Sequence, residues 1–193
     1  MRLLAIDQSL RHAAFSLFED EKFINTFSWK LAVNDTNEVC YETFYNNINK
    51  IIIQEKPDKV ICEKMFMGFN AAVFGKLSEL TGIIRAICIG KKIPFESIHI
   101  ASYRAALGIK NNKEIAQTLI KSMYPEIEFN NDDETDATAL ALGYLVMEKR
   151  KEMNSRQKEI EELQIELDSL EEGDPREDLL IEQIELLKVR EIK

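Results

Sequence analysis

Apolar and polar positions along the first two thirds of the chain alternate between strand-like and helix-like spacing. Five short apolar segments are typical of strands, at residues 2–7, 15–18, 23–29, 58–63 and 93–98. A polar turn at residues 19–22 joins the second and third segments, so the chain is expected to open with three antiparallel strands. Helical spacing of apolar residues predicts helices at residues 35–55, 71–90, 101–107, 113–124 and from 132 onward. This order of strands and crossover helices predicts an α/β fold with a mixed five-stranded sheet flanked by helices.

The pattern changes near residue 149, where the chain becomes highly charged. A 3-4-3 spacing typical of a coiled-coil seam joins four apolar residues there, Ile160, Leu163, Leu167 and Leu170. After a break near Gly173, Asp174 and Pro175 are typical of the start of a second helix. We therefore predict two domains, a body at residues 1–148 and a charged helical hairpin or coiled-coil extension at residues 149–193. The expected role of this extension is dimerisation or the binding of a protein partner.

Composition narrows the class of protein. The chain has 193 residues, 45% of them hydrophobic, with only 4 prolines and 7 glycines, which indicates a folded protein. Its three cysteines, at positions 40, 62 and 88, lack the Cys-x-x-Cys spacing of redox and zinc motifs, so we interpret them as reduced core residues of an intracellular protein. The sequence shows neither an apolar run of membrane-spanning length nor a signal peptide. We therefore expect a cytoplasmic protein without a membrane partner.

The formal net charge of −9 argues at first against a nucleic-acid partner, but its distribution changes this interpretation. Residues 149–193 hold 9 Lys and Arg against 14 Asp and Glu, whereas residues 1–148 hold 16 against 20. The body is therefore close to neutral if four of its carboxylates bind metal. Six cations fall between residues 91 and 121: Lys91, Lys92, Arg104, Lys110, Lys113 and Lys121. They are explained either as contacts to a DNA backbone or as an ordinary solvated helix face.

Four carboxylates stand at the ends of apolar elements, where a buried acid needs a partner or a metal ion. Asp7 closes the first strand, Glu63 closes the fourth, and Asp133 and Asp136 share one face at the start of the last helix of the body. Taken singly, Asp7 is also explained as a turn former and Asp133 as a helix cap. Four converging carboxylates suit Mg²⁺ or Mn²⁺. Two such ions about 4 Å apart can activate a water for in-line attack on a phosphodiester.

Three sequence features carry a resemblance to a known family. They are Asp7 after an apolar strand, the pattern Glu-x-x-Phe-Met-x-x-Asn-Ala at residues 63–71, and the pattern Asp-x-x-Asp-Ala-x-Ala-Leu-Ala at residues 133–141. Over residues 1–147 the chain resembles the RuvC family of Holliday junction resolvases, which have a ribonuclease-H-like fold. The resemblance implies that the catalytic metal ligands are Asp7, Glu63, Asp133 and Asp136. It also implies that Lys113 faces the scissile phosphate, that Phe66 stacks on bases at the junction centre, and that two copies act together as a homodimer.

The chain departs from the bacterial pattern of this family at its first aspartate. Bacterial members usually carry Asp-Pro-Gly there, whereas this chain carries Asp7-Gln8-Ser9. In this respect it is similar to the divergent bacteriophage members, in which strict junction specificity can be relaxed toward other branched DNA. The charged extension after residue 148 is not part of the bacterial pattern either.

The function expected from these features is the resolution of Holliday junctions and other branched DNA during DNA recombination and repair. It would be performed by an endonuclease with two Mg²⁺ or Mn²⁺ ions in each active site. The residues expected to contact DNA are Phe66, Phe69, Lys91, Lys92, Arg104 and Lys110. Taken singly, Phe66 and Phe69 are also explained as core residues and Lys113 as an ordinary surface lysine. Two other functions stay open, a non-catalytic scaffold that binds branched DNA and a ribonuclease-H-like nuclease that acts on RNA–DNA hybrids. The expected compartment is the cytoplasm, or the host cytoplasm if the protein is viral.

Overall fold

The computed structural model of the chain describes residues 1–32, 35–65, 70–109, 112–170 and 174–189. It divides into two compact units, Met1–Leu145 and Val146–Lys193. Within the described ranges, every helix is too short or too polar to cross a membrane. The first unit carries a β-sheet with helices, and the second unit is helical.

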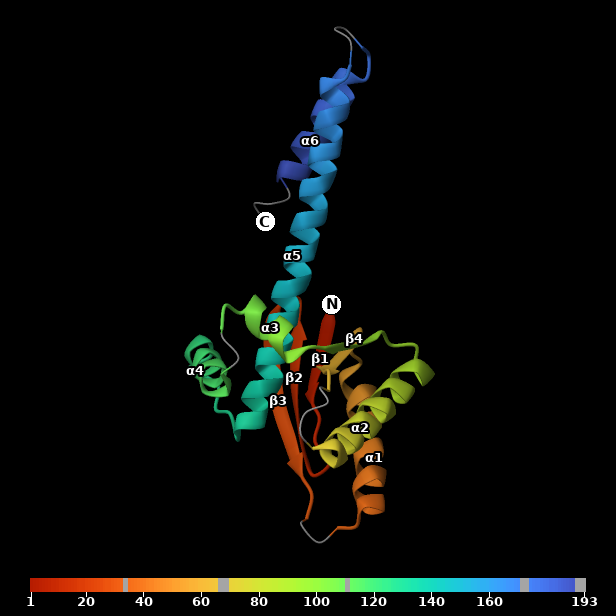
Figure 1. The fold of residues 1–193 in the computed structure, drawn as a ribbon, viewed down its shortest axis with the longest axis vertical. Helices are drawn as coiled ribbons and strands as arrows, with labels where there is room; N and C mark the ends of the chain where they lie inside the picture. Colours follow the sequence, from red (N-terminus) through yellow and green to blue (C-terminus); the bar gives the residue numbers. More distant parts are fainter. Residues whose placement is uncertain (33–34, 66–69, 110–111, 171–173, 190–193) are drawn as a thin grey trace. The chain divides into compact units, whose positions relative to one another are not determined.

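A five-stranded mixed sheet forms the centre of the first unit (Figure 1). Its strands are β1 (Arg2–Asp7), β2 (His12–Glu19), β3 (Lys22–Lys30), β4 (Lys59–Glu63) and β5 (Phe95–Ile98). They lie in the order β3-β2-β1-β4-β5. The first three strands pair antiparallel, whereas β4 runs parallel to both β1 and β5. The predicted mixed sheet is confirmed, and the carboxyl ends of β1, β4 and β5 meet at one edge.

Helices α1 (Asn37–Glu55) and α2 (Ala71–Gly90) cover one face of the sheet (Figure 1). Successive side chains of a strand point to opposite faces, so every second residue of β1, β2 and β4 points toward these helices. The main hydrophobic core lies here, and its members include Ile6, Phe15, Phe44, Cys62 and Leu80. All three cysteines are free and buried in this core, as predicted.

Near the carboxyl end of β1, small and polar side chains occupy the opposite face of the sheet. Asp7 of β1, Ala14 of β2 and Ser28 of β3 pair in one row across the three strands. The first turns of α5 (Asp132–Asp168) lie against this face. Ser28 Oγ donates a hydrogen bond to Glu134 at 2.7 Å, and Thr138 Oγ1 lies 3.0 Å from Ser16 Oγ. The small side chains of the sheet therefore allow α5 to approach closely.

Helices α3 (Ile100–Ala106) and α4 (Lys113–Met123) connect β5 to α5. A glycine allows α5 to pack closely on α3, because a Cβ at Gly143 would lie 2.7 Å from both the Cβ and the carbonyl oxygen of Tyr103. Gly108 follows α3 with a φ of +72°, a conformation that L side chains rarely adopt. The side chain of Asn112 caps α4 by accepting hydrogen bonds from the backbone N–H groups of Glu114 and Ile115. This cap fixes Lys113 in the first turn of α4.

The second unit is a helical hairpin, in which α6 (Glu177–Val189) packs on the C-terminal part of α5. Arg176 pairs with Glu166 at 3.8 Å, and Leu187 lines a small hollow with Glu152 and Glu159. These contacts show that α6 and the C-terminal part of α5 run antiparallel. Among the described residues of the hairpin, the buried apolar side chains are Ile160, Leu180 and Ile184.

Several boundaries differ from those expected, and strand β5, for example, begins at Phe95 rather than at residue 93. The second strand begins at His12 rather than at Phe15, because residues 12–14 are too weakly apolar to be recognised as part of a strand. The helix predicted from residue 132 onward runs without a break past the change of composition to Asp168, since charged side chains such as Glu, Lys and Arg are good helix formers. The last helix begins at Glu177, and Asp174 accepts a hydrogen bond from the backbone N–H of Arg176 before it.

Candidate metal centre

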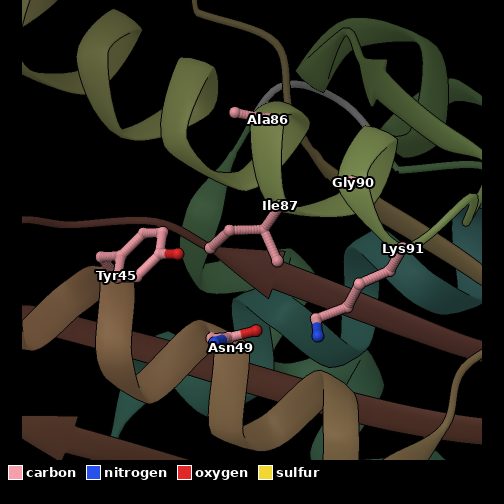
Figure 2. Close-up of a pocket in the computed structure, with 6 residues that line it drawn as sticks. All are labelled: Tyr45, Asn49, Ala86, Ile87, Gly90 and Lys91. Atoms are coloured by element: carbon pink, nitrogen blue, oxygen red, sulfur yellow. The ribbon is translucent and has the colours of Figure 1, made fainter.

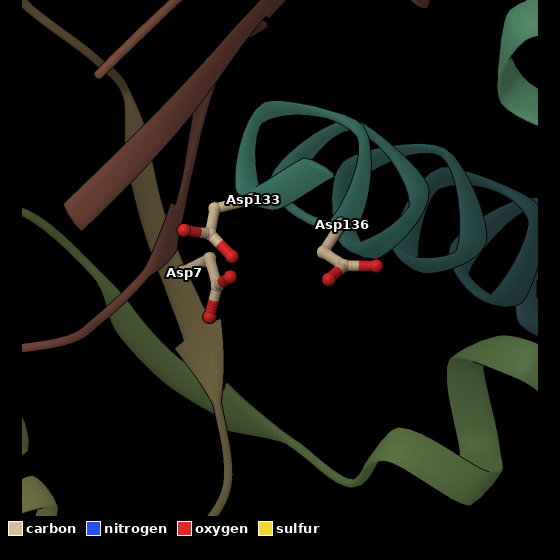
Figure 3. A group of neighbouring side chains, drawn as sticks. All are labelled: Asp7, Asp133 and Asp136. Carbon is tan, nitrogen blue, oxygen red and sulfur yellow. The ribbon is translucent and has the colours of Figure 1, made fainter. Parts of the chain in front are cut away.

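Three aspartates converge at the carboxyl end of β1 (Figure 3). Asp7 is the last residue of β1, while Asp133 and Asp136 lie about one turn apart at the start of α5. One carboxylate oxygen from each aspartate lies within 4.8 Å of the other two. The structure thus brings together three of the four carboxylates that the sequence predicts as metal ligands.

This group of carboxylates is costly in electrostatic terms unless a cation is bound. Burial, followed by the charges of Glu63, Asp136 and Asp133, raises the pKa of Asp7 from 3.8 to about 8. Burial also raises the pKa of Asp136 and that of Glu63. Oδ1 of Asp136 is buried and accepts no hydrogen bond from the part of the chain that the structure describes. Because a hard divalent cation would satisfy this oxygen and neutralise its neighbours, the residues present fit Mg²⁺ or Mn²⁺.

Glu63 lies beside the three aspartates but outside their group. It ends β4, which pairs with β1, and it points to the same face of the sheet as Asp7. The hydroxyl of Tyr103 donates a hydrogen bond of 3.1 Å to Glu63 Oε2. This bond and the charge of Arg104 lower the pKa of Glu63, against the larger effect of burial. Arg104 is only 7% exposed, and its charge acts on both Glu63 and Asp136.

Two basic side chains contact the aspartates directly. Lys113 Nζ lies 2.6 Å from Asp136 Oδ2 and 4.0 Å from Asp133 Oδ1. His12 Nδ1 lies 2.6 Å from Asp133 Oδ2. The predicted lysine therefore lies at the carboxylates, together with a histidine that the sequence analysis leaves out.

Lys91 and Lys92 lie apart from Arg104 and Lys113, although these four cations are close in sequence. Lys91 and Lys92 come just before β5, so they lie at the amino end of the parallel strands, opposite the edge that carries Asp7 and Glu63. A hollow of about 370 Å³ between α1 and α2 includes Lys91 (Figure 2). Its lining residues are Tyr45, Asn49, Ala86, Ile87, Gly90 and Lys91. The expected run of DNA-binding cations is therefore split between two edges of the sheet.

The remaining candidate DNA contacts, Phe66, Phe69 and Lys110, lie outside the described residues. Their assignment stays a prediction from the resemblance.

Two residues that contact the carboxylates, His12 and Tyr103, do not stand out in the sequence. His12 has no second histidine at metal-ligand spacing, and it precedes the expected start of its strand. The alternation of His12, Ala14 and Ser16 on one face of β2 is the signal that could have found it. A buried tyrosine within a helix, such as Tyr103, has no sequence signal that separates it from an ordinary core residue.

Comparison with known proteins gives close agreement on one family name. No family model matches the chain. A protein of Finegoldia magna named crossover junction endodeoxyribonuclease RuvC is 25% identical over 164 residues, covering 80% of this chain and 98% of the relative. Proteins of the same name from Prochlorococcus marinus and Rhizobium johnstonii are 26% and 23% identical. Their matches cover 75% and 74% of this chain, and 96% and 88% of the relatives.

Solved structures show the same fold. Thermus thermophilus RuvC in complex with a Holliday junction substrate matches with a TM-score of 0.68 and 14% identity, over 78% of this chain and 96% of that chain. The yeast mitochondrial Holliday junction resolvase matches with a TM-score of 0.55 and 16% identity, over 75% of this chain and 78% of that chain. The chain is a RuvC homologue. The bacterial RuvC relatives are matched over 88% or more of their length, so the similarity extends over nearly the whole of each.

Proposed function

We propose that this RuvC homologue is a metal-dependent endonuclease that resolves four-way DNA junctions and other branched DNA. The observation that carries the proposal is the convergence of Asp7, Asp133 and Asp136 at the sheet edge of a RuvC-like fold. Relatives named crossover junction endodeoxyribonuclease support the choice of substrate. A protein that only bound DNA would be hindered by these carboxylates, because their charges repel phosphate. Catalysis is therefore favoured over a scaffold role.

Asp7, Asp133 and Asp136, joined by Glu63, are assigned as the ligands of two Mg²⁺ or Mn²⁺ ions. Carboxylate oxygens are the ligands that these hard cations prefer. Such ions, when bound, neutralise phosphate charge and activate a water for in-line attack on the phosphodiester. Without metal, Asp7 is largely protonated at neutral pH, because its pKa is about 8. It therefore gives up its proton when a metal ion binds.

Lys113 is assigned to the scissile phosphate. Its ammonium group lies 2.6 Å from Asp136, and its side chain is 52% exposed, so the flexible stem can carry the charge from the carboxylate to an incoming phosphate. His12 is assigned a supporting role, because its contact of 2.6 Å with Asp133 orients that carboxylate.

The acting form is proposed to be a homodimer, since two copies related by a two-fold axis can cut two opposing strands of a four-way junction. Phe66, Phe69 and Lys110 are kept as proposed DNA contacts. Base–aromatic stacking of the kind assigned to Phe66 is worth about 1–3 kcal/mol per base. The helical hairpin of the second unit is proposed to bind a second copy or a protein partner, and the compartment is proposed to be the cytoplasm.

Cleavage assays in Mg²⁺ or Mn²⁺ test this function. Their substrates are a synthetic four-way junction, linear duplex, Y-shaped DNA and an RNA–DNA hybrid. Paired nicks near the branch point of the junction are expected, with linear duplex left intact. Preferred cutting of the hybrid would support the ribonuclease-H-like alternative. Tight junction binding without cleavage in either ion would support the scaffold alternative.

A further inference from the structure

Glu134 lies between Asp133 and Asp136 in the first turns of α5 and is fully buried, at 0% exposure. Its carboxylate accepts hydrogen bonds from Ser28 Oγ at 2.7 Å and from the backbone N–H of Asn130 at 3.1 Å. The side-chain amide of Asn130 donates to both carboxylate oxygens, at 3.1 and 3.2 Å. These donors are all neutral. Because burial of a carboxylate is costly, the bonds offset that cost only while each donor keeps its position.

These bonds tie α5 to one particular row of the sheet. Ser28 pairs with Ala14, and Ala14 pairs with Asp7, so the serine that binds Glu134 shares a row with the first aspartate of the candidate metal centre. Asn131 strengthens the tie, because its amide donates to Ser28 Oγ at 2.8 Å and its Oδ1 accepts from the backbone N–H of Glu134 at 3.0 Å. These hydrogen bonds therefore fix the position of α5 relative to the strand residue Asp7.

The helix transmits this constraint to Asp133 and Asp136. Successive residues of an α-helix are rotated by about 100°, so fixing the direction of Glu134 also fixes the directions of Asp133 and Asp136. The neighbouring Asp132 shows the contrast, because it is exposed and pairs with Lys121 at 3.6 Å. An acid that served only to complement the helix dipole would not need to be buried.

We propose that Glu134 is a positioning residue for the metal centre. It fixes the first turn of α5 against the sheet, so that Asp133 and Asp136 meet Asp7 at ligand distance. Sets of metal ligands have to be held within about 0.5 Å of their working geometry, and the hydrogen bonds from Ser28 and Asn130 to Glu134 supply that restraint. This inference rests on the proposed function, since it concerns the same metal ligands.

The proposal is tested by Mn²⁺ binding to the full chain, without reference to cleavage. Binding is measured as the rise of the melting temperature while Mn²⁺ is titrated. Glu134→Gln keeps the size of the side chain but replaces an acceptor by a donor that faces Ser28 and Asn130. We expect the apparent Kd for Mn²⁺ to rise about tenfold, which is typical when groups that orient metal ligands are replaced. Ser28→Ala removes a single donor and is expected to raise the Kd less than Glu134→Gln does. It serves as the second variant if Glu134→Gln does not fold.

Tyr144→Phe is the matched control. Tyr144 lies on the same helix, is 1% exposed, and accepts a hydrogen bond of 2.6 Å from Lys59 Nζ, about two turns beyond Asp136. Its replacement should lower the melting temperature and leave the Kd for Mn²⁺ unchanged.

Three results would overturn the proposal. An unchanged Kd in Glu134→Gln and in Ser28→Ala would refute the positioning role and leave the proposed function intact. An equal rise of the Kd for Mn²⁺ in Tyr144→Phe would mean that the weaker binding reflects a general loss of stability rather than positioning by Glu134. A wild-type protein that Mn²⁺ does not stabilise would refute the proposed function, and this inference with it.

Discussion

The ionisation of Asp7 links the folding of this chain to metal binding. Its pKa is raised to about 8 by burial and by three neighbouring carboxylates, whereas the ordinary value is 3.8. The folded protein therefore holds a proton that the unfolded chain releases. The resulting stability is fully present below pH 3.8 and is lost as the pH rises through about 8. A cation that takes the place of the proton reverses this loss.

We predict that Mg²⁺ raises the melting temperature of the wild type more at about pH 9 than at about pH 6, because protons compete with the cation for Asp7. Asp7→Asn removes the ionisable group. This variant should be more stable than the wild type at about pH 9 without metal, and Mg²⁺ should stabilise it much less. Thermal unfolding of both proteins at the two pH values measures these differences. An equal effect of Mg²⁺ at both pH values would contradict the raised pKa.

Replacement of Lys113 tests its assignment to the scissile phosphate. Lys113→Met should lower the cleavage rate about a hundredfold, a loss typical when one group that stabilises developing charge is removed. Lys121→Met is the control, since Lys121 lies on the same helix but pairs with the exposed Asp132. Single-turnover cleavage of a junction by the two variants gives the comparison. Equal losses would mean that bulk positive charge matters and that the position of Lys113 does not.

The sequence is informative about the acids of the candidate site and much less so about their surroundings. The four predicted carboxylates stand out because an acid at the end of an apolar run conflicts with burial. His12, Tyr103 and Glu134 give no comparable signal. Their contacts depend on the pairing of β2 with β3 and β1 and on the packing of α3 and α5, and both are set by tertiary structure.

At the scale of secondary-structure elements, the packing of α5 on α3 supports the site. The close approach at Gly143 lets α3 present Tyr103 to Glu63. Gly143→Ala should therefore lower the free energy of unfolding by about 1–3 kcal/mol, even though alanine favours helix by about 1 kcal/mol. Gly82→Ala on α2 is the control, because nothing lies within 4 Å of its added Cβ, and a small gain is expected. Urea unfolding of both variants measures the difference, and a stabilised Gly143→Ala would contradict the packing argument.

Elements with strong periodicity were predictable, and proximity between elements was not. The bounds of α2, Ala71–Gly90, coincide with those expected from its apolar spacing. The cations at 91, 92 and 104 were expected to lie together because they are close in the sequence. Strand β5 lies between them, however, and carries the chain from one edge of the sheet to the other. Only the pairing of β5 with β4 reveals this separation.

At the scale of the whole molecule, the charge distribution restricts how DNA can be bound. Residues 149–193 hold 14 Asp and Glu against 9 Lys and Arg, and residues 1–148 approach neutrality only if the carboxylates at the sheet edge bind metal. Junction binding should therefore depend on the divalent cation and on DNA shape more than on a basic surface, and it should weaken with salt. The curated relatives compared with this chain are bacterial, so the similarity to bacteriophage members stays a prediction.

The most direct measurement compares junction binding and junction cleavage by the wild type and by Asp7→Asn, side by side, in Mg²⁺ or Mn²⁺. We expect the wild type to place paired nicks near the branch point. Asp7→Asn should bind the same junction and leave it uncut, because the variant keeps the fold and loses a metal ligand. Cleavage by both proteins, or by neither when both bind the junction, would contradict a metal-dependent nuclease centred on Asp7.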